Sequence, residues 1–187
     1  MMHLYIKNMV CNRCITAVRN ELTQLGHTVG EITLGEAEIA AEPSVQELKT
    51  IDSSLKKLGF ELIEDRKSRI IEQVKNEIIY LVHHSNDVLL TNLSSWLADK
   101  VNYDYTYLSN LFSEVEGTTI EKYYIAQRIE KVKELLVYNE LSLAQIADML
   151  GYSSAAYLSS QFKKVTGLTP TFYKSVKENK RRSIDQL

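Results

Sequence analysis

The chain of 187 residues is 44% hydrophobic and 25% charged, as in ordinary globular proteins, which argues against wholesale disorder and against a membrane-embedded protein. Its formal net charge of −2 excludes a strongly basic polyelectrolyte, so any nucleic-acid binding must come from a local patch. The start lacks a signal-peptide pattern, and no apolar run approaches the roughly 18 residues of a membrane span, so we expect a cytoplasmic protein without membrane contact.

The charges are unevenly distributed along the chain. Residues 1–66 carry 7 Lys/Arg and 10 Asp/Glu, whereas residues 163–187 carry 7 Lys/Arg and 2 Asp/Glu. The sequence therefore indicates an acidic N-terminal module and a basic C-terminal segment, although a charge run by itself is most often a solvated helix face.

Periodicity in residues 1–66 predicts a small domain of strands and helices. The predicted elements are, in order, a strand over 3–7, a helix over 11–25, a hairpin over 29–41, a helix from 43 to 58 and a strand over 60–63. Gly26, Gly35 and Gly59 stand where a helix ends or a hairpin turns. The order βαββαβ is that of the ferredoxin-like fold, with both helices on one face of an antiparallel sheet.

The same periodicity predicts which side chains face the core of this domain. On the first helix these are Cys14, Val18, Leu22 and Leu25. On the hairpin they are Ile32, Leu34, Ala37, Ile39 and Ala41, and on the second helix Val45, Leu48, Ile51, Leu55 and Leu58.

Cys11 and Cys14, the two cysteines of the chain, lie where the first strand meets the first helix. Their spacing is too short to staple a fold together and indicates a reducing compartment, in which paired thiols bind metal or do redox chemistry. Helix N-terminal amides and the neighbouring Arg13 lower thiol pKa values and favour the metal-binding thiolates. Two thiolates suit a soft ion such as Cu(I), whereas tetrahedral Zn(II) needs two further ligands.

Residues 8–14 read Asn-Met-Val-Cys-Asn-Arg-Cys and resemble the Gly-Met-x-Cys-x-x-Cys signature of heavy-metal-associated domains, the module of copper chaperones and metal-transport ATPases. The resemblance covers about residues 2–64. It implies a ferredoxin-like fold that binds a soft metal ion at Cys11 and Cys14, Cu(I) first, with Zn(II) or Cd(II) as alternatives. Asn8 replaces the usual glycine, and asparagine tolerates a left-handed backbone. Met9 is expected to anchor the loop in the core.

Two other functions are open for this domain. The cysteine pair could serve as a reversible thiol-redox sensor, or the fold could bind an organic effector or a partner protein, with the cysteines incidental. The chain has no Ser/His/Asp constellation, Walker loop or pair of catalytic carboxylates, so we do not expect an enzyme.

Residues 67–187 predict a second, all-helical domain, joined to the first by a linker of a few residues. Its first helix, over 67–85, carries Ile70, Val74 and Ile78 at helical spacing. This stripe is expected to pack onto its own domain, although it could also pair two chains in a homodimer.

Beyond residue 91 the sequence repeats itself at an offset of 50. Residues 107–112 recur as 157–162, both with the pattern Tyr-Leu-Ser-x-x-Phe, and Gly117 recurs as Gly167. Each copy predicts a helix, a short turn and a second helix: 93–101 and 105–115 in the first, 143–150 and 154–165 in the second, with one long helix over 119–138 between them. This is helix-turn-helix geometry, in which the second helix can lie in the major groove of DNA.

Four stretches of this region, residues 126–136, 141–147, 151–154 and 162–170, resemble the AraC-type DNA-binding domain. They include Ala-Gln-Arg-Ile-Glu-Lys-Val-Lys-Glu-Leu-Leu at the start and Phe-Lys-Lys-Val-Thr-Gly-Leu-Thr-Pro at the end. The resemblance spans roughly residues 70–177. It implies a sequence-specific transcription regulator whose two recognition helices enter adjacent major grooves of double-stranded DNA.

By that resemblance, the base-facing positions are Thr106, Ser109 and Asn110 in the first recognition helix and Ala155, Ala156 and Ser160 in the second. Asn110 can pair with adenine, and alanine can contact thymine methyl groups, so we expect readout that favours A·T pairs. Lys163 and Lys164 follow as phosphate ligands, where the first copy has Ser113 and Glu114. The second copy is therefore expected to dominate the affinity for DNA.

Overall fold

The computed structural model describes residues 2–63, 65–85 and 92–178. The chain forms two compact units: the sheet unit, Met1–Tyr80 with Ser94–Gly117, and the helical unit, Leu81–Leu93 with Thr118–Leu187. The N-terminal sheet and the first helix-turn-helix thus belong to the same unit. Within the described ranges, no helix is long and apolar enough to cross a membrane. Lys180, Arg181 and Arg182 of the basic segment lie outside the described residues.

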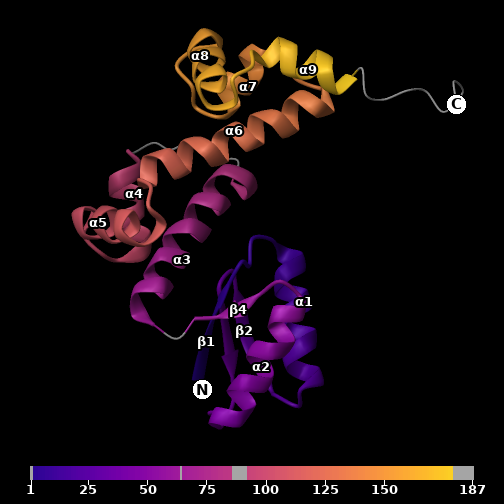
Figure 1. The fold of residues 1–187 in the computed structure, drawn as a ribbon, viewed down its shortest axis with the longest axis vertical. Coiled ribbons are helices and arrows are strands. Elements are labelled where there is room, and N and C mark those ends of the chain that lie inside the picture. The colour runs from indigo at the N-terminus through magenta and orange to yellow at the C-terminus, as the bar shows by residue number, and fades with distance from the viewer. Residues whose placement is uncertain (1, 64, 86–91, 179–187) are drawn as a thin grey trace, which may run out of the picture. The chain divides into compact units, whose positions relative to one another are not determined.

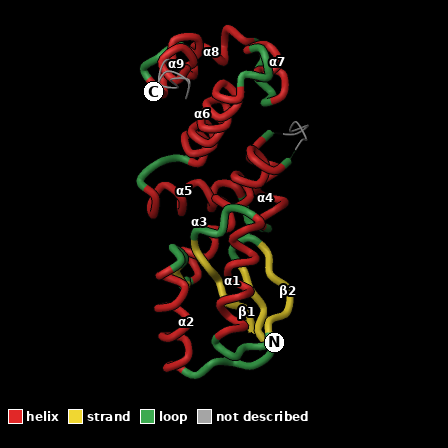
Figure 2. The backbone as a smooth tube through the Cα atoms, turned by 90° about the vertical axis from the view of Figure 1, so that its right-hand side faces the viewer, coloured by secondary structure: helices red, strands yellow, loops and turns green. Residues whose placement is uncertain are grey.

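The sheet unit begins with the element order that periodicity predicts. The elements are β1 (Met2–Lys7), α1 (Asn12–Gln24), β2 (Val29–Thr33), β3 (Glu36–Ile39), α2 (Val45–Lys57) and β4 (Glu61–Leu62). The strands form an antiparallel sheet in the order β2-β3-β1-β4, with Leu4 of β1 opposite Ala37 of β3. Figures 1 and 2 show α1 and α2 side by side against this sheet.

One hydrophobic core lies between the sheet and these two helices. Its buried side chains include Leu4 and Ile6 from β1, Val18 and Leu22 from α1, Ala37 and Ile39 from β3, and Ile51 and Leu55 from α2. Met9 belongs to the same core, as predicted. Because side chains alternate along a strand, Tyr5 points to the opposite face of the sheet.

Three side chains that were predicted to face the core are exposed instead. Ala41 lies beyond the end of β3, where strand alternation no longer applies. Val45 is the first residue of α2 and Leu58 is its C-cap, and their side chains are 73% and 47% exposed. A hydrophobic period therefore predicts burial only within the body of an element and fails at its ends.

The helix α3 links the sheet to the first helix-turn-helix. It spans Arg66–Ile79, is followed by a π-helical turn over Tyr80–His84, and precedes α4 (Leu93–Val101) and α5 (Tyr105–Glu116). The predicted stripe of Ile70, Val74 and Ile78 is buried. The helix itself packs against α5, which belongs to the predicted second domain.

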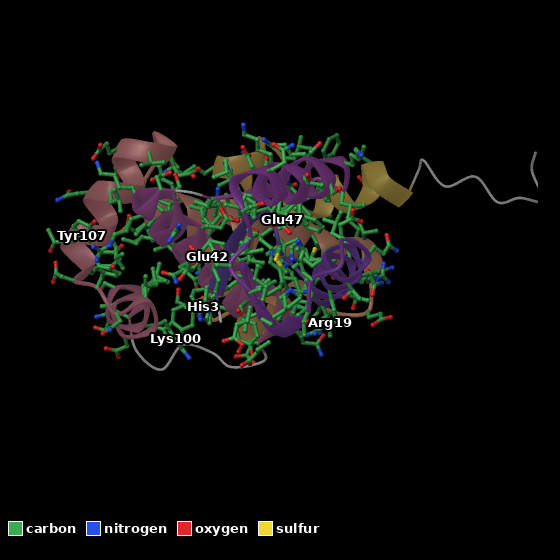
Figure 3. All side chains as sticks on the ribbon, turned by 90° about the horizontal axis from the view of Figure 1, so that it is seen from below. His3, Arg19, Glu42, Glu47, Lys100 and Tyr107 are labelled. Atoms are coloured by element: carbon green, nitrogen blue, oxygen red, sulfur yellow. The ribbon has the colours of Figure 1, made fainter. Side chains whose placement is uncertain are left out.

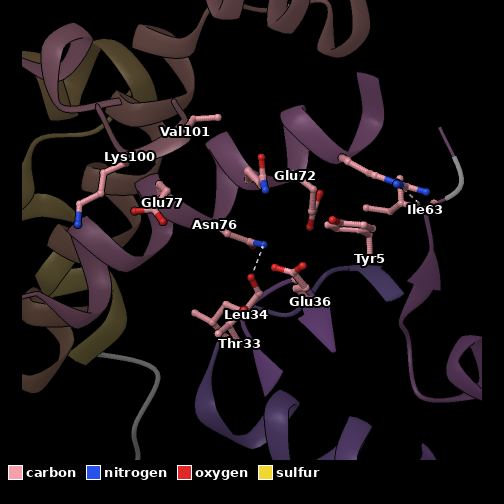
Figure 4. A pocket seen from close by; sticks show the side chains of 13 residues that line it. Tyr5, Thr33, Leu34, Glu36, Ile63, Glu72, Asn76, Glu77, Lys100 and Val101 are labelled. Carbon is pink, nitrogen blue, oxygen red and sulfur yellow. Dashed lines mark hydrogen bonds between the residues drawn. The ribbon is translucent and has the colours of Figure 1, made fainter. Parts of the chain in front are cut away.

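Polar contacts hold α3 against the sheet on the side away from α1 and α2. Asn76 Nδ2 donates to the Leu34 carbonyl at 3.2 Å, and the Arg69 guanidinium lies 4.4 Å from the centre of the Tyr5 ring. Figure 4 shows Asn76 reaching from α3 to the turn between β2 and β3. Gly35 leaves the space for this contact, because a Cβ there would lie 2.4 Å from Asn76 Nδ2.

The helical unit contains the second helix-turn-helix. Its helices are α6 (Ile120–Tyr138), α7 (Leu143–Met149), α8 (Ala155–Thr166) and α9 (Pro170–Glu178). Its core consists of Ile129, Val132, Leu136, Ile146, Ala147, Tyr152, Leu158 and Phe162. The hydroxyls of Thr119, Ser142 and Ser154 cap the first three helices, and Gly167 ends α8 in the left-handed conformation. The predicted helices are confirmed, and α9 is a helix that periodicity did not predict.

Docking of α3 on the sheet can be tested with two glycines of similar backbone but different surroundings. Gly26 and Gly35 have φ of +87° and +93°, and nothing lies within 4 Å of a Cβ at Gly26. We expect Gly26→Ala to lower the free energy of unfolding by about 1 kcal/mol through backbone strain alone. Gly35→Ala should cost about 1 kcal/mol more, because Asn76 must give up its hydrogen bond to Leu34.

The measurement is urea denaturation of both variants beside the wild type. Equal losses for Gly35→Ala and Gly26→Ala would contradict the close packing of Asn76 on the β2–β3 turn.

Candidate nucleic-acid interface and thiol pair

The recognition helix of the second helix-turn-helix is α8, and it has a buried inner face and an exposed outer face. Leu158 and Phe162 are fully buried in the core of the helical unit. The outer face carries exposed side chains at helical spacing, namely Ala156, Tyr157, Ser160, Lys163 and Lys164. Of the predicted DNA contacts on this helix, Ala155 is half-buried and the others are exposed. The predicted phosphate ligands Lys163 and Lys164 thus share a face with predicted base contacts.

The recognition helix α5 of the first copy has the same construction. Asp104 caps it by accepting the N–H groups of Thr106 and Tyr107 at 2.9 and 3.3 Å. Thr106 and Asn110 are exposed and equivalent to Ala156 and Ser160 at the offset of 50, whereas Ser109 is half-buried. The structure gives these side chains their positions, and their contacts with DNA stay predictions.

Two tyrosines of the repeated pattern, Tyr107 and Tyr157, belong to the outer faces of the recognition helices. Tyr107 is 44% and Tyr157 54% exposed, and each lies one residue before a buried leucine. Figure 3 shows Tyr107 at the outer edge of its helix. Their rings lie 5.5 and 6.1 Å from those of Tyr103 and Tyr152. Because tyrosine hydroxyls are common phosphate ligands, these residues join the candidate interface.

The acidic end of α5 is turned toward α3. Glu114 pairs with Lys67 and Glu116 with Lys75, each with N–O distances of 3.1 Å. The second pair is the more buried, with side chains 18% and 27% exposed. Glu114, which stands where the second copy has Lys164, and Glu116 therefore both pair with lysines of α3.

In the helical unit, Arg128 of α6 holds the turn of the second helix-turn-helix. Its guanidinium donates to the Leu150 carbonyl at the end of α7 and lies 3.7 Å from the centre of the Tyr152 ring. Burial raises the pKa of Tyr152, whose ring belongs to the core. Arg128 belongs to the sequence motif of residues 126–136, and in the structure it binds the turn between α7 and α8.

The thiol pair sits at the N-terminal end of α1. Cys11 is the N-cap, the sulfurs of Cys11 and Cys14 lie 3.4 Å apart, and both thiols are free and partly buried. The backbone N–H of Cys14, then its thiol, and more weakly Arg13 favour the Cys11 thiolate and lower the pKa of Cys11. The described residues contain no cluster of three or more His, Cys, Asp or Glu side chains suited to a metal ion. The pair therefore offers two sulfur donors at one helix end.

Asn8 fixes the loop that leads to the thiols. Its φ of 71° is left-handed, the conformation expected where glycine is usual. Its side chain donates to the Gly59 carbonyl at 3.0 Å, and its backbone N–H donates to Glu72 Oε1 of α3 at 2.9 Å. Glu72, which is only 6% exposed, was not identified from sequence because its partner lies 64 residues away along the chain.

The helical region of the chain is similar to that of known proteins. Residues 97–175 match the helix-turn-helix domain family. Over 168 residues the chain is 25% identical to the uncharacterized HTH-type transcriptional regulator YtdP of Bacillus subtilis, a match covering 86% of this chain and 22% of that protein. Over 78 residues it is 37% identical to the xylose operon regulatory protein of Escherichia coli K12, covering 42% of this chain and 20% of that protein. The chain spans about a fifth of the length of these relatives, which are regulators and not enzymes.

Solved structures share the fold. The C-terminal domain of AraT, a response regulator from Geobacillus stearothermophilus, matches with a TM-score of 0.51 and 28% identity over 64% of this chain and 93% of that chain. A transcriptional regulator from Chromobacterium violaceum with an AraC-type DNA-binding domain matches with a TM-score of 0.50 and 24% identity over 58% and 95%. The chain therefore carries a helix-turn-helix DNA-binding region. Its fold is similar to that of AraC-type DNA-binding domains.

The role of the α8 lysines can be tested through salt dependence. We expect Lys163→Ala/Lys164→Ala to weaken binding to all DNA sequences and to reduce the slope of log affinity against log salt by about 1 per lysine, because each phosphate contact releases counterions. The matched control is Lys49→Ala/Lys57→Ala, which removes the same charge from exposed positions of the sheet unit. The measurement is fluorescence anisotropy across a salt series, and an unchanged slope in the α8 variant would contradict the assignment.

The lowered pKa of Cys11 predicts that this thiol is alkylated at a lower pH than a free cysteine. Because the thiolate is the nucleophile, the rate of alkylation by iodoacetamide should rise with pH around a midpoint below the value of about 8.5 for a free cysteine. Cys14→Ala should raise the midpoint by removing the side-chain hydrogen bond while the backbone N–H of residue 14 still donates. Peptide mass spectrometry resolves Cys11, and a midpoint equal to that of the urea-unfolded chain would contradict the prediction.

Proposed function

We propose that the chain is a sequence-specific, DNA-binding transcription regulator whose affinity for its promoter responds to a soft metal ion at Cys11 and Cys14. In this proposal α5 and α8 read adjacent major grooves, and the N-terminal module, with a ferredoxin-like fold similar to heavy-metal-associated domains, is the sensor. The observation that carries it is that the thiol pair and α5 belong to one compact unit. A change at the thiols therefore reaches a DNA-reading helix without crossing a flexible linker.

The donor set is the reason for choosing a soft ion. Two sulfurs 3.4 Å apart, one with a lowered pKa, suit Cu(I), which accepts few thiolate ligands. A tetrahedral Zn(II) or Cd(II) site would need further donors, which a second chain or DNA-bound partner would have to supply. The protein's own contribution is to hold Cys11 and Cys14 at the end of α1, where the loop anchored by Met9 and Asn8 restricts their movement.

The test is DNA binding by the full chain to a fragment of its own upstream region. Anisotropy is measured with Cu(I), Zn(II) or Cd(II), or with a chelator, in a reducing buffer. We expect Cu(I) to change the affinity at least about fivefold, the lower range of allosteric coupling. Cys11→Ser/Cys14→Ser should bind DNA as the metal-free wild type does and show no response.

The same titration includes a control variant and can also contradict metal sensing. Lys49→Ala, altered at an exposed position of α2 in the same module, should respond like the wild type. Equal DNA affinity of the wild type in Cu(I) and in chelator would contradict metal sensing.

Thiol redox is the second candidate function, favoured by the same 3.4 Å separation and by the lowered pKa of Cys11. It predicts a response of DNA affinity to an oxidised thiol pair that is reversed by dithiothreitol and is independent of added metal. Metal-dependent affinity under reducing conditions separates the two functions, and a response to neither leaves an organic effector or partner protein as the signal.

A further inference from the structure

A chain of polar contacts runs from the thiol loop to the end of the first recognition helix. The Asn8 N–H donates to Glu72 Oε1 at 2.9 Å, and Glu72 Oε2 lies 3.9 Å from Lys75 Nζ. Lys75 Nζ in turn lies 3.1 Å from Glu116 Oε1, at the last residue of α5. All of these residues lie in the sheet unit, and Figure 4 shows Glu72 projecting from α3 toward the sheet.

Because Glu72 and Lys75 are largely buried, loss of one contact in this series of polar contacts is energetically costly. The Glu72 side chain is 8% exposed and that of Lys75 is 18% exposed. A buried carboxylate that loses a hydrogen-bond donor is costly unless another donor replaces it. The nearest available cation in this chain of contacts is Lys75, which now makes its short contact with Glu116 and only a long one with Glu72.

We propose that Glu72 and Glu116 compete for Lys75, and that this competition couples the loop before Cys11 to the last turn of α5. When the Asn8 N–H is withdrawn from Glu72, Lys75 moves to Glu72 and releases Glu116. The last turn of α5 then loosens from α3. This inference rests on the proposed function, since it names how occupancy of the thiol pair reaches the DNA-reading helix.

The neighbouring ion pair supplies a matched control. Lys67 and Glu114 also join α3 to α5 at 3.1 Å, but their side chains are 59% and 66% exposed. Among the contacts of the described residues, none joins Lys67 or Glu114 to Asn8 or Glu72. Neutralising Glu114 removes one α3–α5 ion pair without touching the competition for Lys75.

The first arm of the experiment uses metal-free full chain and amide hydrogen exchange of residues 113–117. We expect Glu72→Gln to slow this exchange by at least about threefold, because Lys75 then has Glu116 as its one acidic partner. The same change should have no effect in a Glu116→Gln background and its full effect in a Glu114→Gln background. Circular dichroism confirms that each variant is folded.

Equal effects of Glu72→Gln in the Glu116→Gln and Glu114→Gln backgrounds would overturn the competition. So would the absence of any effect in the wild-type background. Since no metal is added, this arm decides the inference even if the proposed metal sensing is wrong.

The second arm adds Cu(I) and measures the same amides. The expected result is faster exchange in the wild type and in Glu114→Gln, and no change in Glu72→Gln, with Cu(I) bound equally by all of them. A Cu(I) effect of wild-type size in Glu72→Gln would overturn the relay. Failure of the wild type to bind Cu(I) would instead contradict the proposed function.

Discussion

The sheet unit depends on the contact between α3 and the N-terminal sheet. This helix buries Ile70, Val74 and Ile78 on one side and places Glu72 and Asn76 against the loops of the sheet on another. A buried carboxylate is tolerated here because it accepts the N–H of Asn8, and Asn8 in turn has the left-handed backbone that the loop before the thiols requires. The same helix, α3, therefore contacts both the thiol loop and the first recognition helix.

The two helix-turn-helix copies use charge in different ways. At equivalent positions α8 presents Lys163 and Lys164 to the outside, whereas α5 has an acidic end that pairs with lysines of α3. One copy is thus suited to hold phosphate, and the other is tied to the module that carries the thiols. In the proposed function the first copy is the one that is regulated, and α8 is predicted to supply most of the affinity for phosphate.

Sequence predicted the fold well where the signal is local. Periodicity and the glycines at helix ends and turns located the helices and strands of the N-terminal module, and the repeat at an offset of 50 located both helix-turn-helix copies. It failed at the ends of elements, as at Val45 and Leu58, and it gave the exposed Tyr107 and Tyr157 no role of their own. It could not identify Glu72 or the pairing of Glu116 with Lys75, because these contacts join residues 64 and 41 positions apart and leave no periodic signal.

The most direct test of coupling between the thiol pair and DNA binding is the Cu(I) affinity of the full chain, measured by chelator competition with and without saturating promoter DNA. Because linkage is reciprocal, DNA must change the Cu(I) affinity by the same factor by which Cu(I) changes the DNA affinity. The proposed coupling predicts a change of at least about fivefold that disappears in Glu72→Gln. Equal Cu(I) affinities with and without DNA would contradict it.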